Sequence, residues 1–139
     1  CSAARLVEED ATDDACADVG GCIHTGKISY DGIRCRILDL RALLNGAGSQ
    51  AMTAKLHKSL VAKLPKIEKK LDKAAASGTS CPKARSLLAA SAKQLRAFQR
   101  TVNRFSGRQI TDVTLAAELA RRAGEAATHA DETRNDRAC

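Results

Sequence analysis

Six cysteines are the residues of this chain with the clearest chemical potential. They are even in number and widely spaced, and none forms the Cys-x-x-Cys pair used by zinc ribbons and thioredoxin-like redox sites. This pattern is typical of disulfides formed in an oxidising compartment, so we expect a secreted, extracellular or cell-surface protein. The predicted disulfide cysteines are Cys1, Cys16, Cys22, Cys35, Cys81 and Cys139.

Catalysis and metal binding need closely placed ligands or a nucleophile beside a base, and the sequence offers no such cluster. The histidines lie in separate regions, as His24, His57 and His129. Cys22 and His24 are a possible metal-binding pair, but a zinc site needs four ligands at tight spacing. We therefore predict no catalytic residue, no metal and no cofactor.

An acidic run and a glycine pair have residue types that occur in ligand sites. The run Glu8-Glu9-Asp10-Ala11-Thr12-Asp13-Asp14 lacks the alternation and the bidentate Glu of an EF-hand loop, which favours a solvent-exposed acidic loop over a calcium site. Gly46 and Gly48 have no Lys-Ser or Lys-Thr behind them, so they do not form a phosphate-binding loop.

Two segments carry closely spaced basic residues. Lysines crowd residues 63–73, and arginines recur every four residues from 96 to 108. They predict either a solvated helix face or contact with an anionic polymer or an acidic protein surface. Phe98 and Phe105 fall at core positions, and this shortage of exposed aromatics disfavours base stacking and sugar stacking. The predicted interaction surface comprises Lys66, Lys69, Lys70, Lys73, Arg96, Arg100, Arg104 and Arg108.

Charge is divided unevenly along the chain. Residues 1–32 hold two basic and seven acidic residues, a formal charge of −5, while residues 33–139 hold 21 basic and nine acidic residues, a charge of +12. The acidic region either lies against the basic helices and partly neutralises them, or leaves a cationic face free to attract a polyanion.

The elements that position these residues are predicted to be helices. Residues 1–32 lack periodicity and contain many Asp, Gly and Thr residues, which indicates a looped cap. A first helix begins near Ile33 and ends at the glycines after Asn45, and a second spans about residues 52–77. Pro65 predicts either a kink in this second helix or two helices that meet near Leu64.

Two further helices follow. The third opens at Ser80-Cys81-Pro82 and closes at Gly107, and the fourth begins with Thr111 as N-cap and Ile110 stapled onto Leu115, before a polar tail. The predicted core positions of the four helices are Ile33, Ile37, Leu40, Leu44, Met52, Leu56, Leu60, Leu64, Ile67, Leu71, Ala74, Ala84, Leu88, Ala92, Leu95, Phe98, Val102, Phe105, Leu119, Ala123, Ala126 and Ala127.

These elements predict an all-α fold, an up-down four-helix bundle at 33–139 with a disulfide-linked looped cap at 1–32, forming one compact domain. Short connections make neighbouring helices antiparallel, so Cys81 and Cys139 reach the same end and are predicted to pair. Cys35 is expected at that end too. For the other bridges we predict Cys16 with Cys22 and Cys1 with Cys35, among 15 possible connectivities.

No stretch is apolar enough to span a membrane, and no signal peptide is present, which suggests a mature or excised form. Cys1 could alternatively be the lipid-bearing residue of a bacterial lipoprotein, but this would leave one thiol unpaired.

Two stretches resemble known families. Thr12-Asp13-Asp14-Ala15-Cys16 with Gly21-Cys22-Ile23-His24-Thr25 resembles a cysteine-rich repeat of secreted bacterial proteins, although Ala11 replaces its usual cysteine. Residues 33–127 resemble the FIMAH-type helical module, through the order of the helices, the apolar spacing and the turn Ser106-Gly107-Arg108-Gln109-Ile110-Thr111. The resemblance implies an accessory, non-catalytic domain of a secreted bacterial protein.

From these observations we predict a non-catalytic structural or interaction module of the bacterial cell exterior, either a self-assembling filament subunit or a unit of a larger protein. The partners expected are other copies or neighbouring domains. The alternative is a basic helical module that binds an anionic polymer, either polysaccharide or nucleic acid.

Overall fold

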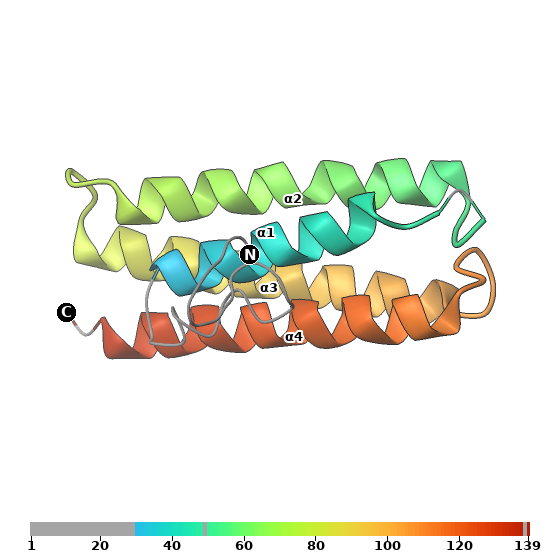
Figure 1. Cartoon of the computed structure of the whole chain (residues 1–139). Coiled ribbons are helices and arrows are strands. Elements are labelled where there is room, and N and C mark those ends of the chain that lie inside the picture. Colours follow the sequence, from blue (N-terminus) through green and yellow to red (C-terminus); the bar gives the residue numbers. More distant parts are fainter. Residues whose placement is uncertain (1–29, 49, 138) are drawn as a thin grey trace, which may run out of the picture.

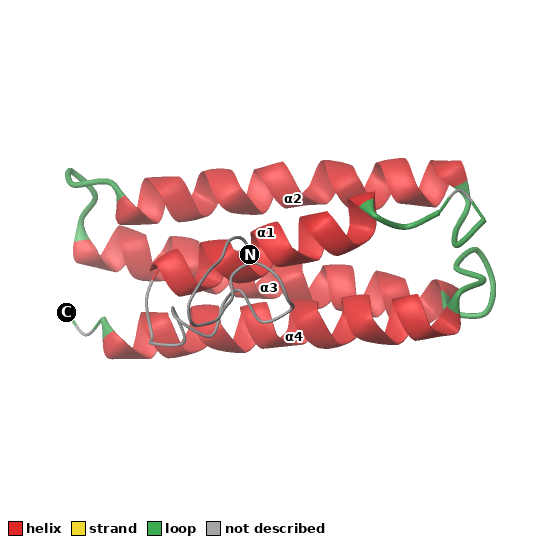
Figure 2. Ribbon diagram, viewed as in Figure 1, coloured by secondary structure: helices red, strands yellow, loops and turns green. Residues whose placement is uncertain are grey.

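The computed structural model describes residues 30–48, 50–137 and 139, and these form a four-helix bundle (Figure 1). The helices are α1 (Tyr30–Asn45), α2 (Ala54–Ala75), α3 (Cys81–Phe105) and α4 (Val113–Asp136). Each helix runs opposite to the one before it, and α1 and α3 each contact both α2 and α4. The described part contains no strand, as Figure 2 shows. The predicted all-α, up-down architecture is confirmed.

The interior consists of the apolar stripes that the sequence predicted. Every predicted core residue from Ile33 to Val102 is at most 5 % exposed, and so are the four predicted on α4. Phe105 differs, because it is the last residue of α3 and packs only partly against the core. Burial of about 25 side chains makes apolar area removed from water the main stabilising contribution.

Pro65 lies inside α2, which continues through it as one helix. Proline removes one backbone donor and crowds the preceding turn, at a cost of about 3 kcal/mol in a helix interior. Six buried residues line one side of α2, from Leu56 to Ala74, and their burial in the core exceeds this cost. Of the two alternatives, the single helix is therefore the one observed.

Two helices, α1 and α4, begin at other residues than predicted. α1 begins at Tyr30 rather than at Ile33, with Asp31 in its first turn, where a carboxylate favours the helix dipole. Gly32, expected in the cap, is helical and buried. The predicted boundary between residues 32 and 33 therefore falls inside α1. Tertiary packing outweighs the low helix propensity of glycine at this position.

The N-cap of α4 is Asp112, so the prediction of Thr111 was wrong by one residue. The Asp112 carboxylate accepts a hydrogen bond from the backbone N–H of Leu115 at 3.0 Å. The Thr111 hydroxyl instead donates to the carbonyl oxygen of Gln50 at 2.6 Å. Because Gln50 lies in the α1–α2 connection, Thr111 joins two loops at one end of the bundle, a contact that local sequence does not contain.

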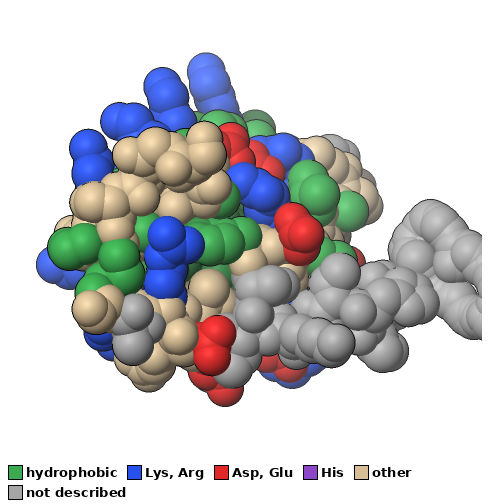
Figure 3. Space-filling model, turned by 90° about the vertical axis from the view of Figure 1, so that its left-hand side faces the viewer, with side chains coloured by type: hydrophobic (Ala, Val, Ile, Leu, Met, Phe, Trp, Pro, Cys, Tyr) green, Lys and Arg blue, Asp and Glu red, His purple; other side chains and the backbone are tan. Residues whose placement is uncertain are grey.

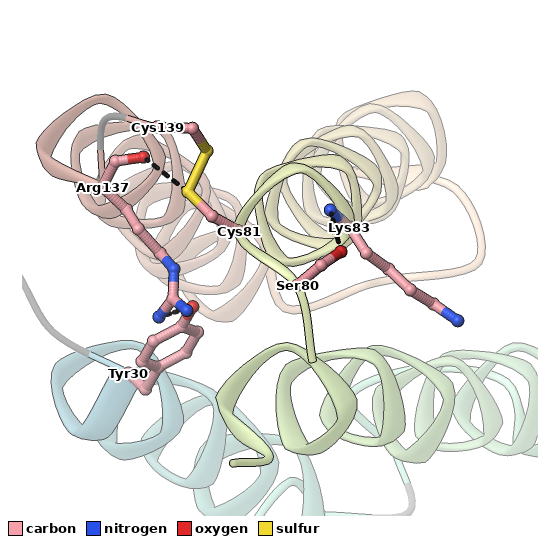
Figure 4. Close-up of a disulfide and its surroundings, with 6 residues drawn as sticks. All are labelled: Tyr30, Ser80, Cys81, Lys83, Arg137 and Cys139. Carbon is pink, nitrogen blue, oxygen red and sulfur yellow. Dashed lines mark hydrogen bonds between the residues drawn. A yellow bond between two sulfur atoms is a disulfide. The ribbon is translucent and has the colours of Figure 1, made fainter. Parts of the chain in front are cut away.

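The opposite end of the bundle carries a disulfide between Cys81 and Cys139, as predicted (Figure 4). It joins the first residue of α3 to the chain just beyond α4 across 58 residues of sequence. Beside it, Arg137 donates to the Tyr30 hydroxyl at 3.2 Å and so links the end of α4 to the start of α1.

The remaining cysteine predictions are only partly within the described residues. Cys35 is disulfide-bonded. Its predicted partner Cys1, and the predicted pair of Cys16 with Cys22, lie outside the described residues, as does nearly all of the predicted cap.

Candidate functional site

Seven lysines lie on α2 and give this helix a strongly positive surface. We call this set the lysine face; it consists of Lys55, Lys58, Lys63, Lys66, Lys69, Lys70 and Lys73. Five of them are exposed, and only Lys63 and Lys70 are half-buried. Seen from the disulfide end, Lys and Arg side chains project from the side where α2 lies (Figure 3).

The two acidic residues of α2 do not neutralise the lysine face, because they point to α1. Asp72 accepts from Arg34 at 2.8 Å, and Glu68 forms an ion pair with Arg41. No ammonium group of a described lysine takes part in an ion pair or a hydrogen bond. The lysine face therefore keeps its full charge.

α3 adds further positive charge, since it contains six basic residues and no acidic residue in its 25 positions. Arg96, part of the predicted surface, is bound to Asp131 of α4 at 2.6 Å. Arg100 and Arg104 are exposed without an ion pair, and Arg104 lies over the ring of Phe105 at 6.0 Å. Arg108 lies beyond the end of α3, so the predicted arginine row is not one continuous helical stripe.

The bundle thus has two walls of different charge. α2 and α3 together carry thirteen basic and two acidic residues, a formal charge of +11, and we call them the basic wall. α1 and α4 together carry six basic and seven acidic residues, a charge of −1, and we call them the paired wall. Charge therefore differs not only along the chain, between residues 1–32 and 33–139, but also across the bundle.

Arginine ion pairs hold the paired wall together. Arg122 binds Asp39 of α1 at 2.7 Å and Glu118 of its own helix at 2.9 Å. Arg121 binds Glu118 as well, and it reaches Glu125 at 2.7 Å. Hydrogen bonds from Arg121 and Arg122 lower the pKa of Glu118 from 4.5 to about 2, and the bond to Glu118 raises the pKa of Arg121. Arg122 thereby links α4 to α1, whereas Arg121 is paired within α4.

Two open hollows occur on the described surface. One of about 680 Å³ lies along α4, and the charged groups at its edge include Arg36, Arg96 and Arg121, each already bonded within the protein. The other, of about 540 Å³, lies at the disulfide end between Tyr30 and Arg137. The first hollow also borders Thr128, His129 and Glu132, and the His129 Nδ1 lies 3.9 Å from a Glu132 carboxylate oxygen.

Metal-ligating residues do not cluster in the part of the chain that the structure describes: no three His, Cys, Asp or Glu side chains are placed to hold an ion. His57 instead contacts the Leu44 carbonyl oxygen at 3.0 Å, near the end of α1. None of the four helices is long and apolar enough to cross a membrane.

The structure adds residues that the sequence analysis did not include in the interaction surface. These are Lys55, Lys58 and Lys63 on α2, and Lys83 and Lys93 on α3, none of which has an ion pair. For the two lysines of α3, the complete lack of acidic residues from 81 to 105 already indicated in the sequence that no partner lies on their own helix. Arg96, which was predicted to be part of the interaction surface, instead forms an ion pair between α3 and α4.

Comparison with known proteins identified no matching family model, no matching curated protein and no matching solved structure. The resemblance to the FIMAH-type module and to the cysteine-rich repeat therefore stays a prediction. The function has to be argued from the surface itself.

Proposed function

We propose that this chain is a non-catalytic interaction module that works outside the cell and binds an anionic polymer through its basic wall. The observation that carries this proposal is the +11 charge of α2 and α3, with no lysine paired within the described residues. The Cys81–Cys139 disulfide supports an oxidising, extracytoplasmic compartment.

The placement of the charge favours binding over simple solvation. Solubility requires a net charge, but mixed signs would serve it without self-repulsion along one side. Here the seven lysines lie on a helix of 22 residues, about 33 Å long. Each lysine near an anionic surface contributes about 1 kcal/mol of attraction, so several together support specific retention at moderate salt.

Retention on immobilised heparin tests the proposal, with a variant that neutralises three exposed lysines of α2. We expect Lys66→Gln/Lys69→Gln/Lys73→Gln to elute at clearly lower salt than the wild type. A matched control, Thr114→Glu/Ala117→Glu/Thr128→Glu, changes the net charge by the same amount at exposed positions of α4. It should elute close to the wild type, because these positions lie on the paired wall.

Elution of the wild type at low salt would reject the proposal. Equal loss of retention by both triple variants would also contradict it, since net charge rather than the basic wall would then determine binding. Circular dichroism of each variant confirms that helicity is retained.

Self-assembly is a second candidate function, favoured by a specific charge difference. Residues 1–29 carry two basic and six acidic residues, whereas the remainder of the chain has a net charge of +11. Opposite charges could join the N-terminal region of one copy to the basic wall of another. Analytical ultracentrifugation tests this, because assembly predicts a mass that rises with concentration and falls with salt, and a constant monomer contradicts it.

A further inference from the structure

The lysine face is interrupted on the outward side of α2. Lys55 and Lys58 lie near the start of the helix, and Ala62 takes the next outward position. The exposed lysines therefore form two groups, one at each end of α2. The group near the disulfide end is the larger, with Lys66, Lys69 and Lys73 exposed and Lys70 half-buried.

Three lysines of the larger group lie toward α3. Glu68 and Asp72 identify the flank of α2 that faces α1, since both bind arginines of α1. α2 contacts only α1 and α3 among the described helices, so the flank on the other side of its apolar stripe faces α3. The helical repeat of about 100° per residue places Lys66 and Lys70 on this second flank, with Lys73 about 40° from its centre.

Lys83 lies on the flank of α3 that faces α2. Cys81 points to the opposite flank, because its disulfide joins it to Cys139 beyond the end of α4. Lys83 follows two residues later, so the helical repeat turns its side chain about 200° around the axis from Cys81. Figure 4 shows Cys81 and Lys83 on opposite sides of α3. Since α3 contacts only α2 and α4, Lys83 lies on the side of α2.

Lys73 and Lys83 lie at the same level of the α2–α3 hairpin. Lys73 is near the last residue of α2, Lys83 is near the first residue of α3, and the two helices are antiparallel. Hydrogen bonds fix the connection here: the Thr79 hydroxyl donates to the Lys73 carbonyl oxygen at 2.6 Å, and the Ser80 hydroxyl accepts from the backbone N–H of Lys83 at 3.4 Å. These bonds hold both backbones and leave both ammonium groups available.

Four lysines therefore meet at this end of the basic wall, and we call them the hairpin cluster: Lys66, Lys70, Lys73 and Lys83. The sequence contains no acidic residue between Asp72 and Asp112, and Asp72 itself binds Arg34 of α1. Asp31 and Asp136 lie at the same end but border the hollow beside α1 and α4. No ammonium group of the cluster forms an ion pair within the described structure, so its charge is not neutralised.

The loop end of the basic wall does not repeat this arrangement. Lys58 lies toward α1, because it follows His57, which contacts a carbonyl oxygen of α1 at 3.0 Å. The cation of α3 at this end, Arg104, lies over the Phe105 ring at 6.0 Å, and the helical repeat places it about 60° farther from α2 than the cluster's member on α3. Asp112, the N-cap of α4, adds a negative charge at this end.

The hairpin cluster has no ring on which a base or a sugar could stack. Phe98 is fully buried, Phe105 lies at the other end of α3, and Tyr30 belongs to α1. Lysines act as compact point charges without the bidentate geometry of arginine, so such a site recognises charge density. From Lys66 to Lys73 the helix rises only about 10 Å, which matches a short stretch of a polymer.

We infer that the anionic polymer binds mainly at the hairpin cluster, where lysines of both helices contact one short stretch of phosphate or sulfate groups. This inference rests on the proposed function and gives the position of its ligand, the number of contacts and the mode of recognition. The polymer crosses from α2 to α3 rather than following the whole length of α2. Lys55 and Lys58 then contribute only through longer-range attraction, which physiological salt screens within about 8 Å.

Two double variants test the position by fluorescence anisotropy with a labelled heparin fragment. We expect Lys73→Gln/Lys83→Gln to weaken binding about tenfold, because two direct contacts are lost. The matched control Lys55→Gln/Lys58→Gln removes the same charge, also at exposed positions, and should weaken binding less than about threefold. Lys83→Arg keeps the charge and should bind like the wild type.

The salt dependence of binding counts the contacts. A plot of log affinity against log salt falls by about 0.7 to 0.9 for each contact, so four lysines predict a slope of about −3 to −4 for the wild type. Lys73→Gln/Lys83→Gln should reduce this slope by about two, and the control should leave it nearly unchanged. A wild-type slope steeper than about −6 would show that the whole basic wall makes contact, and would overturn the inference.

The same measurements decide which statement fails. If both double variants weaken binding equally, the polymer is not centred on the hairpin cluster, although the proposed function stands. If the wild type does not bind heparin, the proposed function itself fails. Thermal unfolding should be unchanged in each variant, because the substituted lysines are exposed and have no ion pair.

The mode of recognition is tested with an oligodeoxythymidylate and an abasic deoxyribose-phosphate oligomer of the same length. We expect equal affinities, because the phosphates are the same and the hairpin cluster has no aromatic side chain to stack on the bases. An oligodeoxythymidylate that binds more than about tenfold tighter would show that bases are recognised, and would contradict recognition by charge alone.

Discussion

The two walls of this bundle use basic residues for different purposes. On the paired wall, four of the six described arginines bind acidic partners on their own or a neighbouring helix, as Arg122 does with Asp39 and Glu118. On the basic wall, lysines have no such partner. The comparison shows that net charge alone describes this protein poorly, because part of its positive charge is structural and part is free.

The choice of residue agrees with this division. Arginine has a planar fork of donors that suits carboxylates and is weakly hydrated, so it serves partly buried ion pairs. Lysine keeps a strongly hydrated point charge on a flexible stem, which suits an exposed surface that holds no fixed geometry. Every ion pair between different described helices involves arginine.

The largest expected effect comes from removing the disulfide that joins the two walls. Cys81 begins α3 of the basic wall, and Cys139 follows α4 of the paired wall. Cys81→Ala/Cys139→Ala should lower the free energy of unfolding by about 2–4 kcal/mol, because a bridge across 58 residues restricts the unfolded chain. Urea unfolding measures this, and a change below about 0.5 kcal/mol would contradict it.

A second comparison applies the same substitution to each wall. Arg122→Met should lower the free energy of unfolding by about 2 kcal/mol, because it removes the partner that Asp39 and Glu118 share. The Arg122 side chain is only 17 % exposed, so these ion pairs are partly buried. Lys66→Met should change it by less than about 0.5 kcal/mol, because Lys66 has no ion pair. Equal effects of the two substitutions would remove the distinction between the walls.

Acid should weaken the paired wall through Glu118, whose pKa falls from 4.5 to about 2 in the folded protein. Because the folded pKa is the lower one, its contribution is complete above pH 4.5 and is lost as the pH falls toward 2. Glu118 is partly exposed, so screening reduces this contribution to about 1 kcal/mol. When the free energy of unfolding is measured between these pH values, Glu118→Gln should lose less stability than the wild type as the pH falls. Parallel plots of stability against pH for the two proteins would contradict the role given to Glu118.

The smallest expected effect concerns repulsion within the basic wall. Lys66→Gln/Lys69→Gln/Lys73→Gln should raise the free energy of unfolding by up to about 0.5 kcal/mol at low salt, because like charges repel along the exposed side of α2. The difference from the wild type should vanish at about 1 M salt, where charges are screened within about 3 Å. A lower stability of the variant at low salt would show that these lysines have stabilising contacts.

Much of the fold could be predicted from the sequence, because apolar residues at a helical repeat identify both a helix and its buried side. The positions from Ile33 to Val102 illustrate this, and so does the pairing of Cys81 with Cys139, which follows from antiparallel helices. The cap of α4 was misplaced because Thr111 and Asp112 are both good N-caps. The Gln50 carbonyl, which binds Thr111 from another loop, decides between them.

The candidate site was predictable only in part. Local sequence identifies Lys66, Lys69 and Lys73 as exposed cations, because they lie away from the apolar stripe of their helix. It does not show that Lys70 is half-buried. It cannot show that Arg96 is bound to Asp131, which is 35 residues away, or that Arg122 meets Asp39 across 83 residues.

Residue types and the 3.6-residue repeat are enough to define the four helical segments, their buried sides and the number of charges. Which charges remain free depends on how the helices pack. Packing brings the acidic residues of α4 and of one flank of α2 to arginines on neighbouring helices, and it leaves the lysines of α2 facing outward. Ion pairs depend on distances between segments remote in sequence, and only the packed helices set those distances.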